Sequence, residues 1–457
     1  MHEALFRAVR VAGVTLAACA VMAMAGCGGS QPAAADLIIT NASIWTGNPK
    51  QPQAEALAIR GDRIAAVGRA ADVKAWRGPH TTIIDADHRG VLPGFNDAHV
   101  RLLDGAEQLG HTNADTRPLT AATRLRMVRQ ALQYAASLGV TSLQDMSPDD
   151  ETLAAYQELA DEGALTARIY VAPIETSWRD QAKLGIRRAF GSPVLRLGAI
   201  NGLADGSLAG HTAYFFQPYA DLPNDRGRLS EEMQPLSSIE SRLTEADAAG
   251  LQICMDAVGD QAISLVLDIY QHIEDANGTR DRRLRIERAQ TVAADAFDRF
   301  AKLGVIASVQ PYHAVADGPL AEERLGPDRA SRSYAYKSFL DHHVTLAFGS
   351  DWPAEPLDPL QTIDAAVTRR TIDGKHPDGW MPAQRISMAD AVRAYTAGSA
   401  DAEFRDRDLG TLEPGKLADV VILNKDIFGF EISVAPASIK DVHVDTTIMG
   451  GRVVYHR

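Results

Sequence analysis

The sequence predicts an α/β protein in which a (β/α)8 barrel of the TIM type is joined to a small β domain. Between about residues 93 and 404, eight short apolar stretches alternate with segments in which apolar residues recur at helical spacing. The chain on either side consists of short β-rich runs broken by tight turns such as Gly61-Asp62 and Gly450-Gly451. A length of 457 residues leaves room for one large barrel and one small domain.

The barrel is expected over residues 93–404, with its chemistry at the carboxyl ends of the strands. Helical patterns separate most of the strands; one example places Leu125, Val128 and Leu132 on a single helix face. A long Gly-rich insertion at 202–228 follows the fourth strand and is a candidate lid. The eight expected strands are 90–95, 139–144, 167–172, 195–200, 251–255, 284–287, 305–310 and 345–348.

The β domain is expected to contain both ends of the chain, over residues 36–92 and 405–457. Short strand patterns at 37–39, 56–59 and 64–67 have the hairpin texture that Gly-Asp turns create. Similar runs occur near the C-terminus, and the two ends therefore predict one domain that both of them build.

The first 26 residues are interpreted as a signal peptide of the lipoprotein type. Arg7 and Arg10 precede a short apolar region, and Met24-Ala25-Gly26-Cys27 resembles a bacterial lipobox. We expect Cys27 to carry lipid, residues 27–35 to form a tether, and the protein to face the periplasm from the outer membrane. The alternative is an ordinary secretory signal that is cleaved near Ala25.

Composition excludes several other classes of protein. The net charge of −13 and the lack of a basic run argue against a nucleic-acid partner. Apolar residues make up 46% of the chain and charged residues 23%, as in ordinary soluble domains. Only Cys254 lies in the folded body, so no internal disulfide is expected and Cys254 is interpreted as a core residue.

The central stretch of the sequence is 91–101, where an apolar run leads through Pro93-Gly94 to His99 and Arg101 at a strand end. Two histidines at positions 99 and 101 would be a metal-binding pair on one strand face. Position 101 holds Arg instead, and a guanidinium has no lone pair with which to bind a metal. The first strand therefore offers one imidazole and one permanent cation.

Further polar residues follow the other expected strands. For His99 a hydrogen-bonded imidazole competes with a metal ligand, and for Asp351 an ion-pair partner competes with a general base. His313 is a candidate for ligand contact. Glu287 alternates with Arg288 along its strand, so a structural role is expected for it. The candidate site residues are His99, Arg101, Asn201, Asp256, Arg288, His313 and Asp351.

The chain from Asp36 onward resembles the metal-dependent amidohydrolase superfamily, in particular amidohydrolase family 3 with its N-substituted formamide deformylase-like enzymes. The resemblance implies a β-sandwich of both termini packed on the barrel, and a two-metal hydrolase centre. The stretches that carry it are 92–99, 204–208, 257–260, 285–287, 308–311, 348–353 and 410–419.

The resemblance fails where the metals would bind. The family's centre would use His-x-His on strand one, a carbamylated Lys on strand four, one His each on strands five and six, and Asp on strand eight. Only His99 and Asp351 match. The other four positions hold Arg101, Asn201, Asp256 and Arg288.

These substitutions suggest a metal-free protein. Two arginines and two aspartates balance each other, and an Arg–Asp contact at 4 Å is worth up to ~4 kcal/mol at an effective dielectric of 20. We expect no cofactor and a pseudoenzyme that binds a small anionic molecule. One alternative is a hydrolase of non-peptide C–N bonds with a single divalent metal, such as zinc, on His99, Asp256 and Asp351. Another is metal-free hydrolysis with Asp351 as the base.

Overall fold

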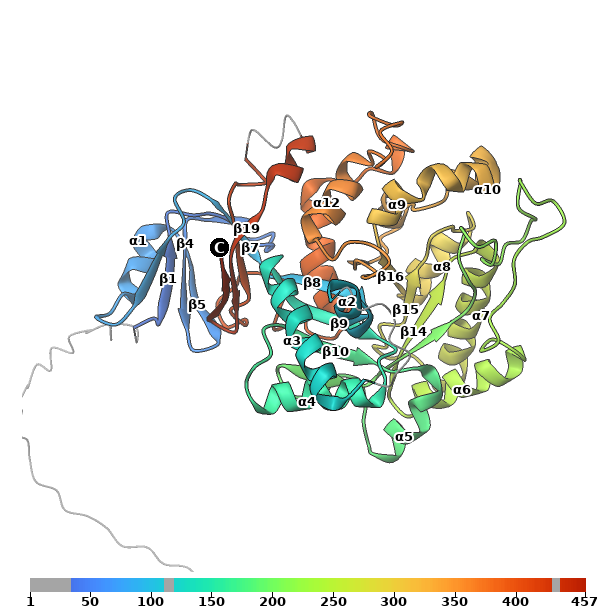
Figure 1. Ribbon diagram of the computed structural model, residues 1–457, viewed down its shortest axis with the longest axis horizontal. Helices are drawn as coiled ribbons and strands as arrows, with labels where there is room; N and C mark the ends of the chain where they lie inside the picture. Colours follow the sequence, from blue (N-terminus) through green and yellow to red (C-terminus); the bar gives the residue numbers. More distant parts are fainter. Residues whose placement is uncertain (1–33, 111–118, 430–435) are drawn as a thin grey trace, which may run out of the picture.

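A computed structural model describes residues 34–110, 119–429 and 436–457. The expected signal peptide, Cys27 and most of the expected tether lie outside these residues. The described chain has a β-rich part and a larger mixed part, which lie side by side (Figure 1). No helix in the described ranges combines the length and apolar character that crossing a membrane requires.

The β-rich part contains two sheets. The first has the order β5-β4-β1-β6 and comprises β1 (Leu37–Thr40), β4 (Ala56–Arg60), β5 (Arg63–Gly68) and β6 (Thr82–Asp85). The second has the order β20-β19-β18-β7-β2-β3 and comprises β2 (Ser43–Trp45), β3 (Gln53–Ala54), β7 (Gly90–Pro93), β18 (Val420–Leu423), β19 (Val444–Met449) and β20 (Arg452–His456).

Both ends of the chain meet in the second sheet, where β18 pairs antiparallel with β7 and Val421 lies opposite Leu92. One apolar core contains residues of both sheets, among them Ile39, Leu57 and Ile448. Short helices α1 (Ala70–Val73) and η1 (Lys74–Trp76) follow β5. This pairing is consistent with the predicted joint β domain. The boundaries of that domain at residues 92 and 405 stay a prediction.

The mixed part has the barrel-type fold that the sequence predicts. Its parallel strands form one sheet of β8 (Phe95–Val100), β9 (Val140–Met146), β10 (Arg168–Ala172) and β12 (Leu195–Leu197), with β11 (Phe190–Gly191) antiparallel at its edge. The other parallel sheet consists of β13 (Ala199–Leu203), β14 (Gln252–Ala257), β15 (Arg285–Arg288), β16 (Ile306–Val309) and β17 (Leu346–Phe348). Isolated parallel bridges, Ile174 with Asn201 and Val100 with Trp352, connect the two sheets at both junctions.

Two expected strands prove to be pairs of strands. The stretch 90–95 is divided at Gly94, because β7 belongs to the β-rich part and the first barrel strand is β8. His99 therefore lies within a strand rather than beyond its end. The stretch 195–200 is divided at Gly198, whose φ of +110° is a conformation that favours glycine.

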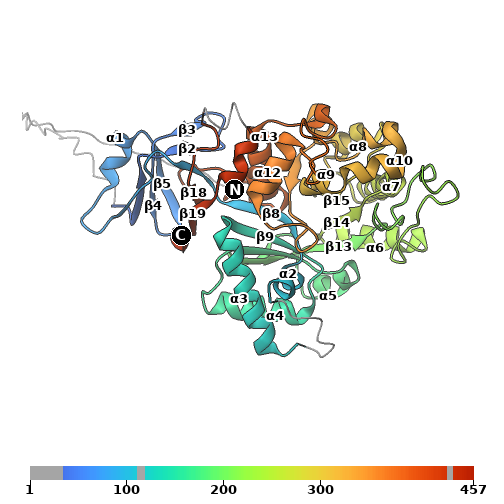
Figure 2. The same ribbon diagram turned by 45° about the horizontal axis from the view of Figure 1, so that its top comes forward.

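Helices surround the strands in both views of the molecule (Figures 1 and 2). Side-chain caps begin several of them; Asp149, for example, accepts a hydrogen bond from the backbone N–H of Thr152. The apolar faces of these helices join one large core with the strands. The helices are α2 (Leu102–Leu109), α3 (Ala121–Ser137), α4 (Asp150–Asp161), η2 (Glu175–Ser177), α5 (Trp178–Lys183), α6 (Leu236–Ala248), α7 (Asp260–Asn277), α8 (Ala296–Leu303), α9 (Tyr312–Ala316), α10 (Gly318–Ala330), α11 (Tyr336–Asp341), α12 (Pro359–Thr368), η3 (Pro382–Gln384), α13 (Met388–Arg393), η4 (Ala394–Gly398), α14 (Ser399–Ala402) and η5 (Pro436–Asp441).

Candidate functional site at the barrel mouth

Five of the seven predicted site residues form one connected group, and a sixth, Asn201, joins it through Asp256. His99 comes from β8, Asp256 from β14, Arg288 from the end of β15, His313 from α9 and Asp351 from the loop after β17. Parallel strands bring their carboxyl ends to the same edge, so residues far apart in sequence meet there.

Arg288 is the cation at the centre of this group. Its Nε donates to Asp256 Oδ2 at 3.1 Å, and its Nη1 and Nη2 lie 2.7 and 3.0 Å from the two oxygens of Asp351. The Arg288 side chain is 20% exposed, whereas those of Asp256 and Asp351 are 1% and 3% exposed. One guanidinium therefore pairs with two buried carboxylates, and its contact with Asp351 has the bidentate geometry that arginine favours.

Backbone geometry at two positions makes this arrangement possible. Arg288 has a φ of +69°, so its side chain does not follow the alternation of β15. Gly349 allows the end of β17 to approach β8, since a Cβ there would lie 2.5 Å from the backbone nitrogen of His99. Two residues later, the backbone N–H of Asp351 donates to the carbonyl of His99 at 2.9 Å.

The buried carboxylate of Glu287 fixes the orientation of the His99 ring. Its Nδ1 lies 2.9 Å from Glu287 Oε2, and Glu287 Oε1 lies 2.7 Å from Arg285 Nε. His99 Nε2 has no hydrogen-bond partner among the described residues and lies 3.5 Å from Asp351 Oδ1. Burial alone would lower the pKa of His99, but the charges of Asp256, Glu287 and Asp351 raise it.

Asp351 is the residue in which these contacts meet. Besides Arg288, it accepts from His313 Nε2 at 3.1 Å. Burial would raise the pKa of Asp351, but Arg288 and the two histidines lower it far below its usual range. An ionised carboxylate of such low basicity suits an ion pair better than a general base.

Asn201 connects the neighbouring strands to Asp256. With its amide assigned so that every atom has a partner, Nδ2 donates to Asp256 Oδ1 at 3.2 Å and Oδ1 accepts from Ser147 Oγ at 3.2 Å. Asn201 therefore lies between Asp256 and Ser147, and Ser147 is not among the predicted site residues.

Arg101 does not join the network, contrary to the expectation that it pairs with an aspartate. Its side chain is exposed and has no hydrogen bond or ion pair with a residue in the described part of the chain. The reason is local: Arg101 follows β8 and precedes α2, and its backbone N–H donates to Trp352. The side chain lines a small hollow of about 170 Å3 together with Asp104, Asp145 and Ser147.

The side chain of Glu287 points into the barrel interior, although we expected it to point away from the site. Strand alternation was expected to turn Glu287 away from the site, because Arg288 was assigned to the site side. The positive φ of Arg288 breaks that relationship, and both side chains reach the interior. Asp317 and Glu355, which contact His313, were missed as well; the i,i+4 spacing of His313 and Asp317 was the available signal.

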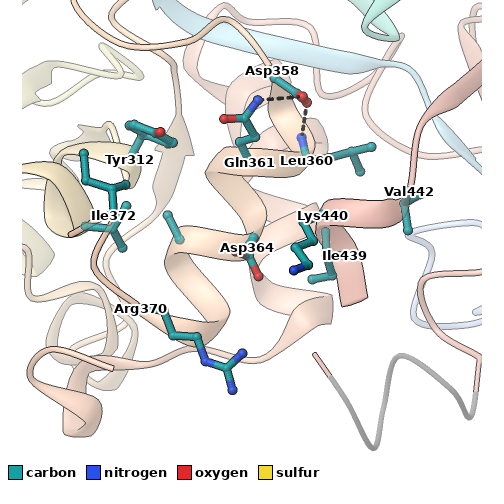
Figure 3. A pocket seen from close by; sticks show the side chains of 12 residues that line it. Tyr312, Asp358, Leu360, Gln361, Asp364, Arg370, Ile372, Ile439, Lys440 and Val442 are labelled. Atoms are coloured by element: carbon teal, nitrogen blue, oxygen red, sulfur yellow. Dashed lines mark hydrogen bonds between the residues drawn. The ribbon is translucent and has the colours of Figure 1, made fainter. Parts of the chain in front are cut away.

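A larger cavity of about 370 Å3 lies away from this group, between α12, η5 and the end of α9 (Figure 3). Tyr312, Asp364, Arg370, Ile372 and Lys440 are among its lining residues. Burial raises the pKa of Asp364 to about 6, although Arg370 and Lys440 oppose the shift. None of the five connected mouth residues lines it.

Residues 101–455 match the sequence profile of the amidohydrolase family. The chain belongs to this family. The N-substituted formamide deformylase of Arthrobacter pascens is 21% identical, over 92% of this chain and 98% of that enzyme. Protein LONG AFTER FAR-RED 3 of Arabidopsis thaliana is 29% identical, over 92% of each chain. The predicted resemblance to amidohydrolase family 3 is thus confirmed.

Comparison with solved structures confirms the fold. A metal-dependent hydrolase from Pyrococcus furiosus has a TM-score of 0.73 at 24% identity and covers 86% of this chain and 100% of that one. Atrazine chlorohydrolase from Arthrobacter aurescens, solved with zinc, has a TM-score of 0.58 at 16% identity, over 91% of this chain and 94% of that one.

The mouth residues do not fit a two-metal centre of the kind that the resemblance implies. Asn201 cannot be carbamylated, and Arg101 and Arg288 have no lone pair to offer. The oxygens of Asp256 and Asp351 that would face a metal are bound to Arg288. His99 Nε2 alone has the geometry of a free ligand, with its other nitrogen held by Glu287.

Proposed function

We propose that this amidohydrolase-family protein has a metal-free barrel mouth and binds a small anionic molecule without hydrolysing it. The observation that supports the proposal is the position of Arg288, which bridges Asp256 and Asp351 at 2.7 to 3.1 Å. The resemblance implies that in the family's hydrolases a metal lies between the residues at these two positions, and here a guanidinium lies between them. Hydrolysis needs an activated water, and Asp351, the candidate base, is an ion-paired carboxylate whose pKa lies far below its usual range.

Replacing Arg288 by a metal would be costly. Each ion pair at about 4 Å contributes up to ~4 kcal/mol at an effective dielectric of 20 before desolvation is subtracted. An incoming divalent ion would have to separate both pairs, or sit within a few ångströms of a guanidinium that repels it. The protonated state favoured for His99 adds a further positive charge beside the same carboxylates.

Arg101 is the residue that we assign to the ligand. Its guanidinium is exposed and unpaired among the described residues, whereas Arg288 is already saturated by two carboxylates. A carboxylate or phosphate group is the chemical partner that an unpaired arginine recognises best. The hollow beside it is lined by the hydroxyl of Ser147 and also by Asp104, Asp145 and Asp149, so Arg101 must outweigh these acids for an anion to bind there.

A second candidate function is C–N bond hydrolysis with one metal on His99, Asp256 and Asp351. One observation favours it: His99 Nε2 lacks a partner while Glu287 holds Nδ1, which is the usual environment of a metal-binding histidine. Three protein ligands and one water would be a sufficient catalytic arrangement. Arg288 would have to leave both aspartates for this site to form.

The position of bound metal decides between the two functions. The full-length protein, purified without chelators, is crystallised and anomalous scattering is recorded at the zinc, iron and manganese edges. We expect no peak within bonding distance of His99 Nε2. A peak that joins His99 to Asp351, together with hydrolysis of an N-formyl amine, would overturn the metal-free proposal.

Ligand binding is tested with defined anions. We expect succinate or inorganic phosphate to raise the thermal midpoint of the wild-type protein, and Arg101→Gln to remove the effect. Arg126→Gln, a change at an exposed arginine of α3, is the matched control and should respond like wild type. An equal response in Arg101→Gln and wild type, or none in either, would contradict the assignment of Arg101.

Attachment to the cell envelope through lipid on Cys27 remains part of the proposal. It is supported by the lipobox-like Met24-Ala25-Gly26-Cys27.

A further inference from the structure

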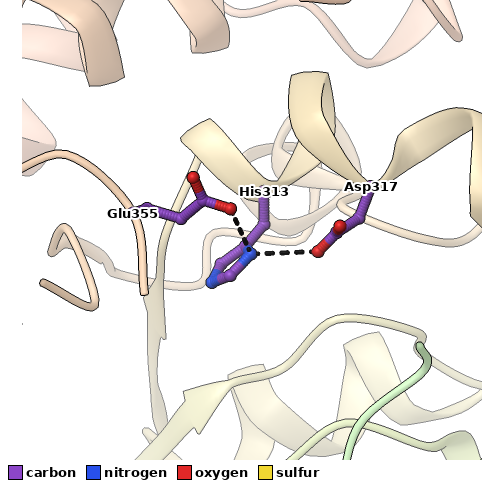
Figure 4. Close-up of side chains that lie close together, drawn as sticks. All are labelled: His313, Asp317 and Glu355. Carbon is purple, nitrogen blue, oxygen red and sulfur yellow. Dashed lines mark hydrogen bonds and ion pairs between the residues drawn. The ribbon is translucent and has the colours of Figure 1, made fainter. Parts of the chain in front are cut away.

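His313, Asp317 and Glu355 lie close together (Figure 4), and His313 connects this cluster to Asp351 of the mouth group. His313 lies in α9, Asp317 follows it between α9 and α10, and Glu355 lies in the loop after β17. His313 Nδ1 is 3.1 Å from Asp317 Oδ2 and 3.2 Å from Glu355 Oε1. One ligand atom of each residue lies within 4.8 Å of the others.

Two carboxylates converge here on a nitrogen that can carry only one proton. Neither the Asp317 nor the Glu355 side chain has another hydrogen bond or ion pair with a residue in the described ranges. A single N–H can point at one oxygen, so the second carboxylate has no donor among the residues that the structure describes. A cation placed between the three atoms would satisfy both carboxylates at once.

The second nitrogen of His313 is already in the state that metal binding requires. Nε2 lies 3.1 Å from Asp351 Oδ2, so a neutral His313 keeps its proton there and turns its Nδ1 lone pair toward Asp317 and Glu355. Metal-binding histidines characteristically donate their other N–H to a carboxylate in this way.

The distances also suit a small divalent ion. Ions with bonds of about 2.0–2.2 Å need neighbouring ligand atoms roughly 3.0–3.5 Å apart in tetrahedral or octahedral geometry. The two measured edges, 3.1 and 3.2 Å, lie in this range.

A buried hydroxyl next to the cluster lacks a partner. Tyr334 is 2% exposed, and its hydroxyl has no hydrogen-bond partner in the described chain. Burial raises the pKa of Tyr334, and the negative charges of Asp317 and Glu355 raise it further. A water molecule on a bound ion is the kind of partner that it lacks.

We propose that His313, Asp317 and Glu355 bind one divalent transition-metal cation, such as zinc or manganese. One imidazole and two carboxylates suit these ions better than calcium or magnesium, which favour oxygen ligands alone. The two carboxylates offset the charge of the ion, and the proton on Nδ1 is released when the ion binds. The site is distinct from the family's metal centre, and the inference does not depend on the proposed function.

The test uses the full-length protein after its metals have been removed with a chelator and the chelator has been dialysed away. Zinc chloride is titrated calorimetrically into wild type and into Asp317→Asn/Glu355→Gln, which preserves shape while removing both charges. We expect one zinc per wild-type chain and an affinity at least 10–100-fold weaker in the variant, since losing even an outer partner of a ligand has that effect. Glu323→Gln/Asp328→Asn makes the same change of charge at exposed positions of α10 and should bind like wild type.

Anomalous diffraction then locates the ion. A peak bonded to His313 Nδ1, Asp317 and Glu355 supports the site, and zinc should raise the thermal midpoint of wild type but not of the double variant. Equal affinity in both proteins, no binding by wild type, or a peak elsewhere would overturn it. A peak on His99 Nε2 would instead overturn the proposed function, so the two failures are distinguishable.

Discussion

Glu287 Oε2 accepts a hydrogen bond from His99 Nδ1 at 2.9 Å, and both side chains are completely buried. The contact connects the cationic Arg285 beneath it to the aspartates of the mouth above it. Opposite charges thus alternate through the barrel interior, from Arg285 through Glu287 and His99 to Asp351 and Arg288. Such a chain is stable only while every member is present, because each charge lies far from water.

Glu287→Gln should therefore be strongly destabilising. It leaves Arg285 without its carboxylate and removes one of the charges that keep His99 protonated, so we expect a loss of about 3–5 kcal/mol in the free energy of unfolding. Urea denaturation at neutral pH measures it. The matched control is Glu240→Gln, which removes a Glu–His contact between exposed side chains at 3.6 Å and should cost less than about 1 kcal/mol. Equal effects would show that the buried contact contributes no more than the exposed one.

Arg288→Ala tests the other end of the chain. It leaves Asp256 and Asp351 buried without their common cation, and we expect about 3–5 kcal/mol of lost stability in EDTA. The comparison is Arg299→Ala, whose partner Asp268 is largely exposed and whose loss should have a small effect. A stable Arg288→Ala protein would mean that the aspartates are protonated or solvated rather than paired.

Much of this fold could be predicted because its signals are local. The alternation of apolar strands and amphipathic helices identifies a barrel, and residues after successive parallel strands must meet at one end. Asp256, Arg288 and Asp351 were assigned to one site on that ground, and Arg288 contacts both aspartates. The division of the stretch 90–95 was not predictable, since its apolar run is uniform while its two halves pair with different sheets.

The wrong predictions of side-chain positions at the site arise from the local backbone conformation. Period-two alternation assigns Glu287 and Arg288 to opposite faces, but the φ of +69° at Arg288 turns its side chain back to the mouth. A positive φ at a non-glycine residue has no sequence signal of its own. Arg101 was placed in the network by analogy with a ligand position, yet the chain turns into α2 there and leaves its side chain exposed.

His313 should make stability depend on pH in a defined direction. Burial would lower its pKa, but hydrogen bonds to Asp317, Asp351 and Glu355 raise it well above the usual range. The folded state thus holds a proton that the unfolded state loses above pH ~6.5. The stabilising contribution is complete below that pH and declines as pH rises toward the folded pKa, by up to ~1.4 kcal/mol per pH unit.

The measurement compares wild type with His313→Gln between pH 6 and 9, in EDTA so that no metal competes for the proton. Because His99 titrates in both proteins, the difference between their unfolding free energies isolates His313. We expect this difference to shrink as pH rises. A difference that does not change with pH would show that the two proteins bind the same number of protons on folding.

Cys27→Ser tests the predicted lipid anchor. If Cys27 carries lipid, wild type should enter the detergent phase in a phase-partition assay and the variant should stay in the aqueous phase. Cys254→Ser is the control, since Cys254 is buried in the folded body and should not influence partitioning. Wild-type protein in the aqueous phase would refute the anchor.

The proposal of a metal-free mouth is tested most directly by replacing Arg288, the cation that we propose excludes a metal. Arg288→His replaces a guanidinium by a possible ligand opposite His99 Nε2, which is the one mouth nitrogen without a partner in the described structure. It also releases Asp256 and Asp351 from their ion pairs. Because zinc prefers two or three nitrogen and carboxylate ligands with one open position, we expect the variant to bind zinc at the mouth. The experiment is carried out in the Asp317→Asn/Glu355→Gln background, so that the cluster around His313 does not contribute. We expect no zinc per chain before the change and about one after it, with the anomalous peak at His99 Nε2.

If the background protein already binds one zinc at His99, the single-metal alternative is correct. If the Arg288→His protein folds, as judged by a cooperative thermal transition, and still binds none, Arg288 is not the residue that excludes the metal.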